Sequence, residues 1–201
     1  MTEPWITVGL GIGGYLAGSI PFGVLISRML GAVDPRTAGS RNIGFTNVLR
    51  VGGKTAGIPT LTGDIAKGWI VAALAVKLIQ SWPLALAIAA TPVLGHLFPV
   101  FLGFHGGKGV ATAFGVLVGV RPGVGWAVVA IWLLTAAVWR YSSGAAVAAF
   151  ALLPLVVVVA RGDLALLIFS VALSAVILMK HRANIQRLWQ GNEPKIGQRP
   201  A

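Results

Sequence analysis

Long apolar stretches make up most of the chain, and short polar clusters separate them. A membrane-spanning helix needs about 20 apolar residues, and its backbone groups must pair within the segment. The pattern therefore predicts an all-α polytopic integral membrane protein, with a single membrane-embedded domain over residues 1–201. The seven candidate spans are residues 5–30, 63–79, 83–102, 110–120, 124–139, 144–160 and 164–179. Residues 110–120 are too few to cross alone unless the glycine-rich segment before them contributes, so five spans is the alternative count.

Composition supports a bilayer as the solvent and narrows the chemistry. Hydrophobic residues make up 56% of the chain and charged residues 10%, whereas soluble domains carry about 25% charged residues. The sequence has no cysteine and only five acidic residues, which excludes thiolate chemistry and leaves little for a carboxylate metal site. We expect no metal and no other cofactor. The net charge of +11 is spread between apolar segments, so we expect anionic ligands and membrane lipids, and no nucleic acid, as partners.

The basic residues are distributed asymmetrically, which predicts the orientation in the membrane. With seven spans, one set of loops holds three of the 16 cations and the other set holds the rest. Because cytoplasmic loops are enriched in Lys and Arg, the N-terminus is expected outside and the C-terminus in the cytoplasm. All three polar clusters would then face the cytoplasm. Residues 191–201 are polar, contain two prolines and are expected to form a flexible cytoplasmic tail.

The first polar cluster, residues 39–50, combines compact hydrogen-bond donors with a guanidinium group. Ser40, Asn42, Thr46 and Asn47 carry short polar side chains. The planar fork of Arg50 suits a phosphate group. The cluster predicts substrate binding, and a polar loop with one orienting arginine is the alternative.

The second cluster, residues 103–112, places Gly106 and Gly107 just before Lys108 and an apolar segment. The unpaired N–H groups at a helix start bind anions, and glycine lets a ligand approach them closely. Lys108 adds a full positive charge at the same point. The spacing predicts a phosphate site, with a simple membrane turn as the alternative. It is not a Walker A loop, because Gly109 stands where that motif requires Ser or Thr.

The third cluster, residues 180–188, ends the last predicted span. His181 and Asn184 are three residues apart and would share one helix face. His181 could bind substrate, act as a base or cap carbonyl groups at a helix end. The neighbouring arginines could bind substrate or only anchor the helix in the cytoplasm.

Three further polar residues stand at or within predicted spans. His96 is ionisable, and such groups inside a membrane are usually functional, but it could equally satisfy a carbonyl group freed by Pro99. Asp64 and Lys67 are one helical turn apart. They predict an ion pair that supports the site rather than a catalytic pair.

Taken together, these motifs resemble those of the bacterial acyl-phosphate:glycerol-3-phosphate acyltransferase family, the PlsY family, over nearly the whole chain. The motifs that carry the resemblance are Ser40-x-Asn42-x-Gly44-x-Thr46-Asn47-x-x-Arg50, Asp64-x-x-Lys67-Gly68, Gly95-His96-x-x-Pro99-Val100-Phe101, Gly106-Gly107-Lys108-Gly109-Val110-Ala111-Thr112 and His181-x-x-Asn184-Ile185-x-Arg187-Leu188. The resemblance implies a seven-helix enzyme of the bacterial inner membrane with its active site facing the cytoplasm. It would transfer an acyl chain from acyl phosphate to the 1-hydroxyl of sn-glycerol 3-phosphate, giving lysophosphatidic acid and phosphate for phospholipid biosynthesis. The family uses neither acyl-CoA nor acyl carrier protein directly, and we expect the chain to function as a monomer.

The resemblance also implies roles for individual residues. The family's site positions correspond to Ser40, Asn42, Arg50, Lys108, Ser143, His181 and Asn184, with Ser142 as the alternative to Ser143. Ser40, Lys108 and the amides of Gly106 and Gly107 would bind phosphate. Arg50, His181 and Asn184 would hold the second phosphate or the glycerol hydroxyls. Among these, Ser40, Lys108 and His181 would be catalytic, and the proton acceptor is either a substrate phosphate oxygen or His181.

Three residues depart from the family pattern, and one other function competes. Arg41 stands where glycine is typical, Phe45 replaces a small residue, and His105 replaces a lysine. The competing function is a membrane transporter of an organic phosphate or another anion. Against it, the chain shows no two-fold internal repeat, and its clusters lie on one predicted side rather than at the midplane.

Overall fold

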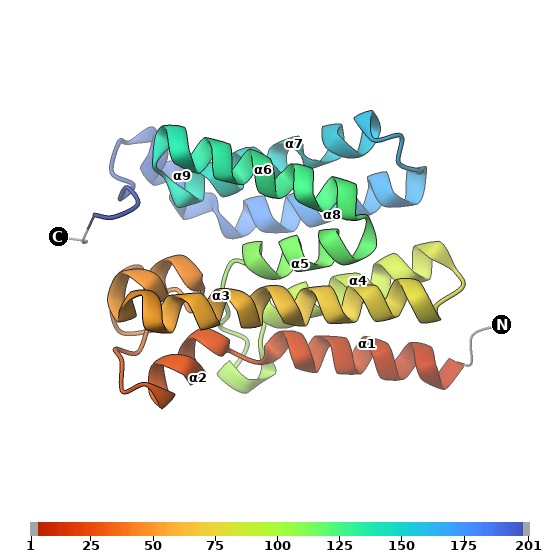
Figure 1. Ribbon diagram of the computed structural model, residues 1–201, viewed down its shortest axis with the longest axis horizontal. Coiled ribbons are helices and arrows are strands. Elements are labelled where there is room, and N and C mark those ends of the chain that lie inside the picture. The colour runs from red at the N-terminus through yellow and green to blue at the C-terminus, as the bar shows by residue number, and fades with distance from the viewer. Residues whose placement is uncertain (1–3, 199–201) are drawn as a thin grey trace.

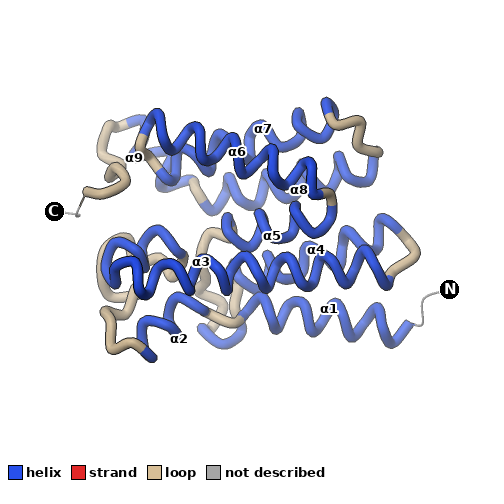
Figure 2. The backbone as a smooth tube through the Cα atoms, viewed as in Figure 1, coloured by secondary structure: helices blue, strands red, loops and turns tan. Residues whose placement is uncertain are grey.

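A computed structural model describes residues 4–198 of the chain, so the last three residues of the predicted tail lie outside the described part. Within that part the fold is helical and contains no strand. The elements are α1 (Pro4–Ser19), α2 (Phe22–Met29), α3 (Phe45–Leu78), α4 (Trp82–Leu97), the 3₁₀ helix η1 (Val100–Leu102), α5 (Val110–Val120), α6 (Pro122–Trp139), α7 (Ser142–Val159), α8 (Leu164–Lys180) and α9 (Arg182–Trp189). Figure 1 shows α1, α3 and α4 on one side, α6, α7 and α8 on the other, and the short α5 between them. Most loops lie at the two ends of these roughly aligned helices (Figure 2).

The first predicted span, residues 5–30, is not one continuous helix. It consists of α1 and α2, which meet at an angle of 47°. Pro21 carries no N–H group and cannot continue the hydrogen-bond pattern of α1. The carbonyl oxygen of Ile20, freed by this break, accepts a hydrogen bond from Lys67 Nζ at 2.9 Å. The break is therefore stabilised from α3, a contact that local sequence does not reveal.

The second predicted span, residues 63–79, lies at the end of α3, which consists of two helices that meet at a kink at Gly53. α3 begins at Phe45, so the second half of the first polar cluster is helical. Gly53 interrupts the regular helix with a φ of 73°, a conformation that glycine adopts without strain. Asn47 and Arg50 therefore lie on the short helix before this kink, and Asp64 lies on the long helix after it, which runs into the core.

The number of membrane spans was predicted as seven. By length and composition, three described stretches can cross: 82–102, 122–139 and 142–159. If each of the two bent helix pairs, α1 with α2 and α8 with α9, forms one span, residues 4–198 contain five candidate spans. α5 has 11 residues and is about 16 Å long, too short for a hydrocarbon core of about 30 Å. Seven spans therefore remains a prediction.

Close helix packing and an apolar exterior are both typical of a membrane protein. A Cβ atom on Gly18 of α1 would lie 2.3 Å from the carbonyl oxygen of Pro92 in α4, so the two backbones touch. Small residues allow such contacts between helices in lipid. Residues 112–117 of α5 are all buried, whereas Leu134, Val138 and Val159 are more than half exposed. These exposed side chains require lipid rather than water around them.

Candidate active site

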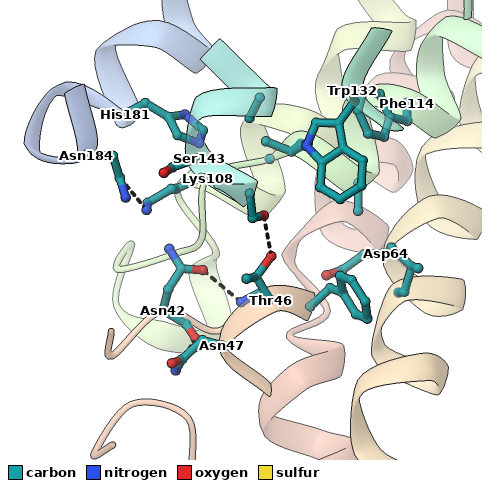
Figure 3. A pocket seen from close by; sticks show the side chains of 18 of the residues that line it. Asn42, Thr46, Asn47, Asp64, Lys108, Phe114, Trp132, Ser143, His181 and Asn184 are labelled. Atoms are coloured by element: carbon teal, nitrogen blue, oxygen red, sulfur yellow. Dashed lines mark hydrogen bonds between the residues drawn. The ribbon is translucent and has the colours of Figure 1, made fainter. Parts of the chain in front are cut away.

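A cavity of about 640 Å³ brings the three polar clusters together. Its polar end is lined by Ser40, Asn42, Thr46, Arg50, Lys108, Ser142, Ser143, His181, Asn184, Arg187 and Glu193. Its apolar end is lined by side chains of α3, α5 and α6, among them Trp69, Phe114, Val118, Trp126, Val129 and Trp132. The first and third clusters, at least 130 residues apart in sequence (from 50 to 180), therefore share one chamber (Figure 3). One end of this chamber suits a charged polar ligand and the other an aliphatic chain.

Asn47 holds the loop before α3 in place. Its Nδ2 donates to the carbonyl oxygens of Pro35 at 2.9 Å, Ala38 at 3.1 Å and Asn42 at 2.9 Å. Its Oδ1 accepts from the backbone N–H of Ser40 at 2.8 Å. Asn47 is 2% exposed and has no N–H group left for a ligand. Its predicted substrate-binding role is therefore replaced by a bracing role.

Asn42 and Thr46 point toward the cavity from the same region (Figure 3). Asn42 Oδ1 accepts from the backbone N–H of Gly44 at 2.8 Å, which leaves its amide N–H groups for a ligand. Thr46 Oγ1 and Ser142 Oγ lie 2.9 Å apart in a hydrogen bond that joins the starts of α3 and α7. Ser142 and Ser143 both line the cavity. Their partners differ, since Ser142 bonds to Thr46 and Ser143 donates to Glu193.

Glu193 lines the cavity, although the sequence motifs did not predict it as a site residue. Its Oε1 accepts hydrogen bonds from Ser143 Oγ and Asn184 Nδ2, both at 2.6 Å, and its Oε2 accepts from Arg187 Nε at 2.7 Å. Burial alone would raise the pKa of Glu193, but these hydrogen bonds and the Arg187 charge outweigh it and lower the pKa. The segment predicted as a flexible tail is thus anchored in the site at Glu193. The sequence offers one signal for this role. Glu193 is the one acidic residue after the cations Lys180, Arg182 and Arg187.

Lys108 is connected to this carboxylate through an amide. Its Nζ donates to Asn184 Oδ1, and the same amide donates to Glu193 (Figure 3 shows the first bond). Burial lowers the pKa of Lys108 to about 8; the charge of Glu193 opposes this, whereas Arg187 and Arg50 add to it. At neutral pH Lys108 is mostly protonated. Three cations against one carboxylate make this end of the cavity attractive to an anion.

His181 is 2% exposed and lies at the junction of α8 and α9. Its Nδ1 is 2.8 Å from the carbonyl oxygen of Ile177. A carbonyl only accepts, so Nδ1 carries the proton and Nε2 keeps a lone pair. The side chain therefore does cap a helix-end carbonyl, one of the predicted possibilities. The ring still lines the cavity with a nitrogen that can accept a hydrogen bond.

The glycine pair serves packing more than anion binding. The N–H of Gly107 donates to the carbonyl oxygen of His96 at 3.1 Å and is therefore not free for phosphate, contrary to the prediction. A Cβ atom on Gly106 would lie 2.1 Å from that same oxygen. The residues that line the cavity here are Gly109, Val110 and Ala111, at the start of α5. The unpaired amides of that helix start, rather than that of Gly107, can face a ligand.

The predicted ion pair between Asp64 and Lys67 is confirmed. Lys67 Nζ lies 2.8 Å from Asp64 Oδ1, and both side chains are almost fully buried. His96 contacts both of them, with Nδ1 3.0 Å from Lys67 Nζ and 3.4 Å from Asp64 Oδ1. Asp64 and His96 also line the cavity. No group of three or more His, Cys, Asp or Glu side chains that could hold a metal ion occurs between residues 4 and 198.

Comparison with known proteins identifies the family. The model of the family described as "Glycerol-3-phosphate acyltransferase" matches residues 8–191. The chain belongs to the glycerol-3-phosphate acyltransferase family. A glycerol-3-phosphate acyltransferase of Nitrosospira multiformis is 49% identical over 189 residues, covering 92% of this chain and 94% of that one. One of Thioalkalivibrio sulfidiphilus is 48% identical over 188 residues, covering 92% of each chain.

Solved structures of the glycerol-3-phosphate acyltransferase family share the fold. The crystal structure of PlsY, an integral membrane glycerol 3-phosphate acyltransferase, in its glycerol 3-phosphate form has a TM-score of 0.89 and 41% sequence identity, and the match covers 96% of each chain. The lysophosphatidic acid form of the same protein has a TM-score of 0.88 and 40% identity. At this level of similarity the resemblance inferred from the motifs is confirmed.

The departures from the acyltransferase family pattern lie at the edge of the site. Arg41 is exposed and has a φ of 57°, which explains why glycine is typical there. Phe45 begins α3 and lines the cavity. His105 is exposed, and its Nδ1 contacts the carbonyl oxygen of Gly103 at 2.7 Å. None of the three disturbs the hydrogen bonds around Lys108 and Glu193.

Proposed function

We propose that this membrane acyltransferase transfers an acyl chain from acyl phosphate to the 1-hydroxyl of sn-glycerol 3-phosphate. The observation that carries the proposal is the two-ended cavity, whose cationic end joins directly to an apolar end. The cationic end matches a phosphate group, and the apolar end matches an acyl chain. The names of the relatives specify glycerol 3-phosphate, and the two PlsY crystal forms contain glycerol 3-phosphate and lysophosphatidic acid.

In the proposed reaction, the 1-hydroxyl oxygen attacks the acyl carbonyl carbon. The bond between that carbon and the phosphate oxygen then breaks, and inorganic phosphate leaves with its electron pair. Lys108 and Arg50 stabilise the negative charge of the two phosphates and hold the reactants together. The leaving group is already a weak base, so it needs little protonation.

The hydroxyl proton has two possible acceptors. One is an oxygen of the leaving phosphate. The other is His181 Nε2, which keeps a lone pair because Nδ1 donates to Ile177. Ser40, Asn42 and Asn184 would orient the glycerol hydroxyls or a phosphate. Replacing His181 by Gln separates the two acceptors, because complete loss of turnover with intact glycerol 3-phosphate binding points to His181.

For the membrane arrangement, we propose seven spans, with the N-terminus outside and the site open to the cytoplasm of the inner membrane. The excess of cations in one set of loops supports this orientation. The glycine-rich segment before α5 would complete the short fourth span. We also propose that one chain suffices for activity, since the cavity is formed within a single chain.

The test is a reconstitution assay. The purified protein in lipid receives labelled glycerol 3-phosphate with palmitoyl phosphate or palmitoyl-CoA, and lysophosphatidic acid is measured. Product from the acyl phosphate alone is the expected result. Product from the CoA ester would overturn the donor. No product from either donor, with glycerol 3-phosphate crossing the bilayer instead, would indicate a transporter.

A further inference from the structure

A buried polar cluster of Asp64, Lys67 and His96 joins α3, α4 and the end of α1. The side chains of Asp64, Lys67 and His96 are 2%, 3% and 4% exposed. Buried polar groups normally have hydrogen-bond partners. In this cluster the pattern of partners determines which nitrogen of His96 carries its proton.

The ammonium group of Lys67 has three N–H donors and no lone pair. Its Nζ is hydrogen-bonded to the Ile20 carbonyl oxygen at 2.9 Å and to His96 Nδ1 at 3.0 Å. Asp64 Oδ1, 2.8 Å away, is its ion-pair partner but lacks hydrogen-bond geometry. A proton on His96 Nδ1 would face an ammonium proton at that distance. Its other possible acceptor, Asp64 Oδ1, is 3.4 Å away, beyond a normal N–H···O hydrogen bond. Nδ1 is therefore the acceptor, and the neutral ring carries its proton on Nε2.

His96 Nε2 lies beside the start of the phosphate-binding region. A Cβ atom on Gly107 would lie 2.2 Å from Nε2, so the ring is packed directly against this glycine. His96 lines the cavity, and Lys108 follows Gly107 in the chain. In the described part of the chain, no acceptor is hydrogen-bonded to Nε2. An N–H group on Nε2 would be left for a ligand, and a ligand oxygen in the cavity could accept its hydrogen bond.

We propose that His96 is a phosphate-binding residue whose Nε2–H donates to a phosphoryl oxygen of a substrate held beside Lys108. Lys67 acts as a positioning residue that sets the His96 tautomer. It stays protonated, and the carboxylate of Asp64 balances its charge. This inference rests on the proposed function, because the phosphoryl group is that of glycerol 3-phosphate or of acyl phosphate. Both offer the same anionic oxygen chemistry. A neutral donor adds a hydrogen bond there without adding charge to an already cationic site.

Two substitutions separate the two sides of the ring. His96→Asn places an amide near Nδ1, so it keeps a partner for Lys67 but removes the Nε2 donor. His96→Gln places its amide N–H near the position of Nε2. A hydrogen bond to a charged group is worth about 10- to 100-fold in affinity. We therefore expect H96N to weaken phosphate binding by about that factor and H96Q to retain most of it.

Binding is measured in lipid nanodiscs with glycerol 3-phosphate and, separately, with a non-hydrolysable acyl phosphonate. The ligand whose affinity falls in H96N identifies the source of the phosphoryl group. His105→Asn is the control, since it removes an exposed imidazole from the loop between η1 and α5, outside the buried cluster. Unchanged binding of both ligands in H96N, or equal losses in H96N and H96Q, would overturn the proposal.

The tautomer can be observed directly in the unmodified protein. The chain has three histidines, so ¹⁵N-histidine labelling gives few signals, and the His96 signal is the one lost in H96Q. We expect a neutral ring protonated on Nε2, with the Nε2 signal shifting when the phosphate ligand is added. A ring protonated on Nδ1, or on both nitrogens, would contradict the inference. If wild-type protein forms lysophosphatidic acid while the His96 ring carries a proton on Nδ1, the proposed function still holds and only the His96 inference is contradicted.

Discussion

Replacing Glu193 by Gln should shift the pH dependence of catalysis, because this carboxylate raises the pKa of Lys108. Glu193 and Lys108 are hydrogen-bonded to the same Asn184 amide. Their charges are therefore separated by one amide and two hydrogen bonds, about 7 Å at most. At that separation the interaction is about 0.6–2.4 kcal/mol for dielectric constants of 80 to 20. Since about 1.4 kcal/mol corresponds to one pH unit, E193Q should lower the Lys108 pKa by about one unit.

The sign follows from the role of the ammonium group. Lys108 must be protonated to attract phosphate, so activity that depends on it falls as pH rises through about 8. In E193Q the fall should occur near pH 7 by the estimate above. Gln keeps one acceptor oxygen and loses the other, so part of the contacts to Ser143, Asn184 and Arg187 is lost. This loss should also reduce turnover by about 10-fold at low pH.

The assay is kcat/KM for glycerol 3-phosphate between pH 5.5 and 9.5 in the same lipid, with unfolding temperature as a check on folding. Asp34→Asn is the control, since it removes one negative charge whose partner is the exposed Arg36. Its alkaline limb should match that of the wild type. If the fall of kcat/KM at alkaline pH in E193Q stays in place or moves to higher pH, the electrostatic coupling between Glu193 and Lys108 is refuted.

Three further predictions concern the backbone around the site. G107A should raise KM for glycerol 3-phosphate about 10-fold or more, because the new Cβ atom would lie 2.2 Å from His96 Nε2 and displace the loop; G9A, with no atom within 4 Å of its Cβ, should leave kinetics unchanged. R41G should raise the free energy of unfolding by about 0.5–1 kcal/mol. Left-handed backbone costs a non-glycine residue about 1–2 kcal/mol, and the greater entropy of glycine in the unfolded chain offsets part of the relief of that cost. A lower unfolding temperature would contradict this prediction. N47A should destabilise by about 2–4 kcal/mol, because it removes the donor to three carbonyl groups; loss of substrate affinity with unchanged stability would instead restore a direct binding role.

Several features could be predicted because they depend on local sequence. Apolar runs fix the solvent as lipid, and helix periodicity places Asp64 one turn from Lys67, where the structure finds their ion pair. The motifs around Asn42, Lys108 and His181 marked segments that line the cavity. In each case the relevant information lies within a few residues along the chain.

Other features depend on contacts between distant segments and were missed. The break at Pro21 is held by Lys67, 47 residues away from the Ile20 carbonyl group. Glu193 reaches Ser143, 50 residues earlier, so a segment that looks like a tail becomes part of the site. The Gly107 amide is occupied by His96, which no motif shows.

The sequence by itself determined the solvent, the helical class and the family, since apolar length, helix periodicity and ordered motifs are properties of the chain. Only the tertiary structure decided which polar groups remain free for a substrate. Whether Asn47 or Asn42 keeps a free amide, and which nitrogen of His96 or His181 carries a proton, depends on partners brought close by folding. A hydrogen-bonding group is available to a ligand only when its neighbours in space leave it unpaired.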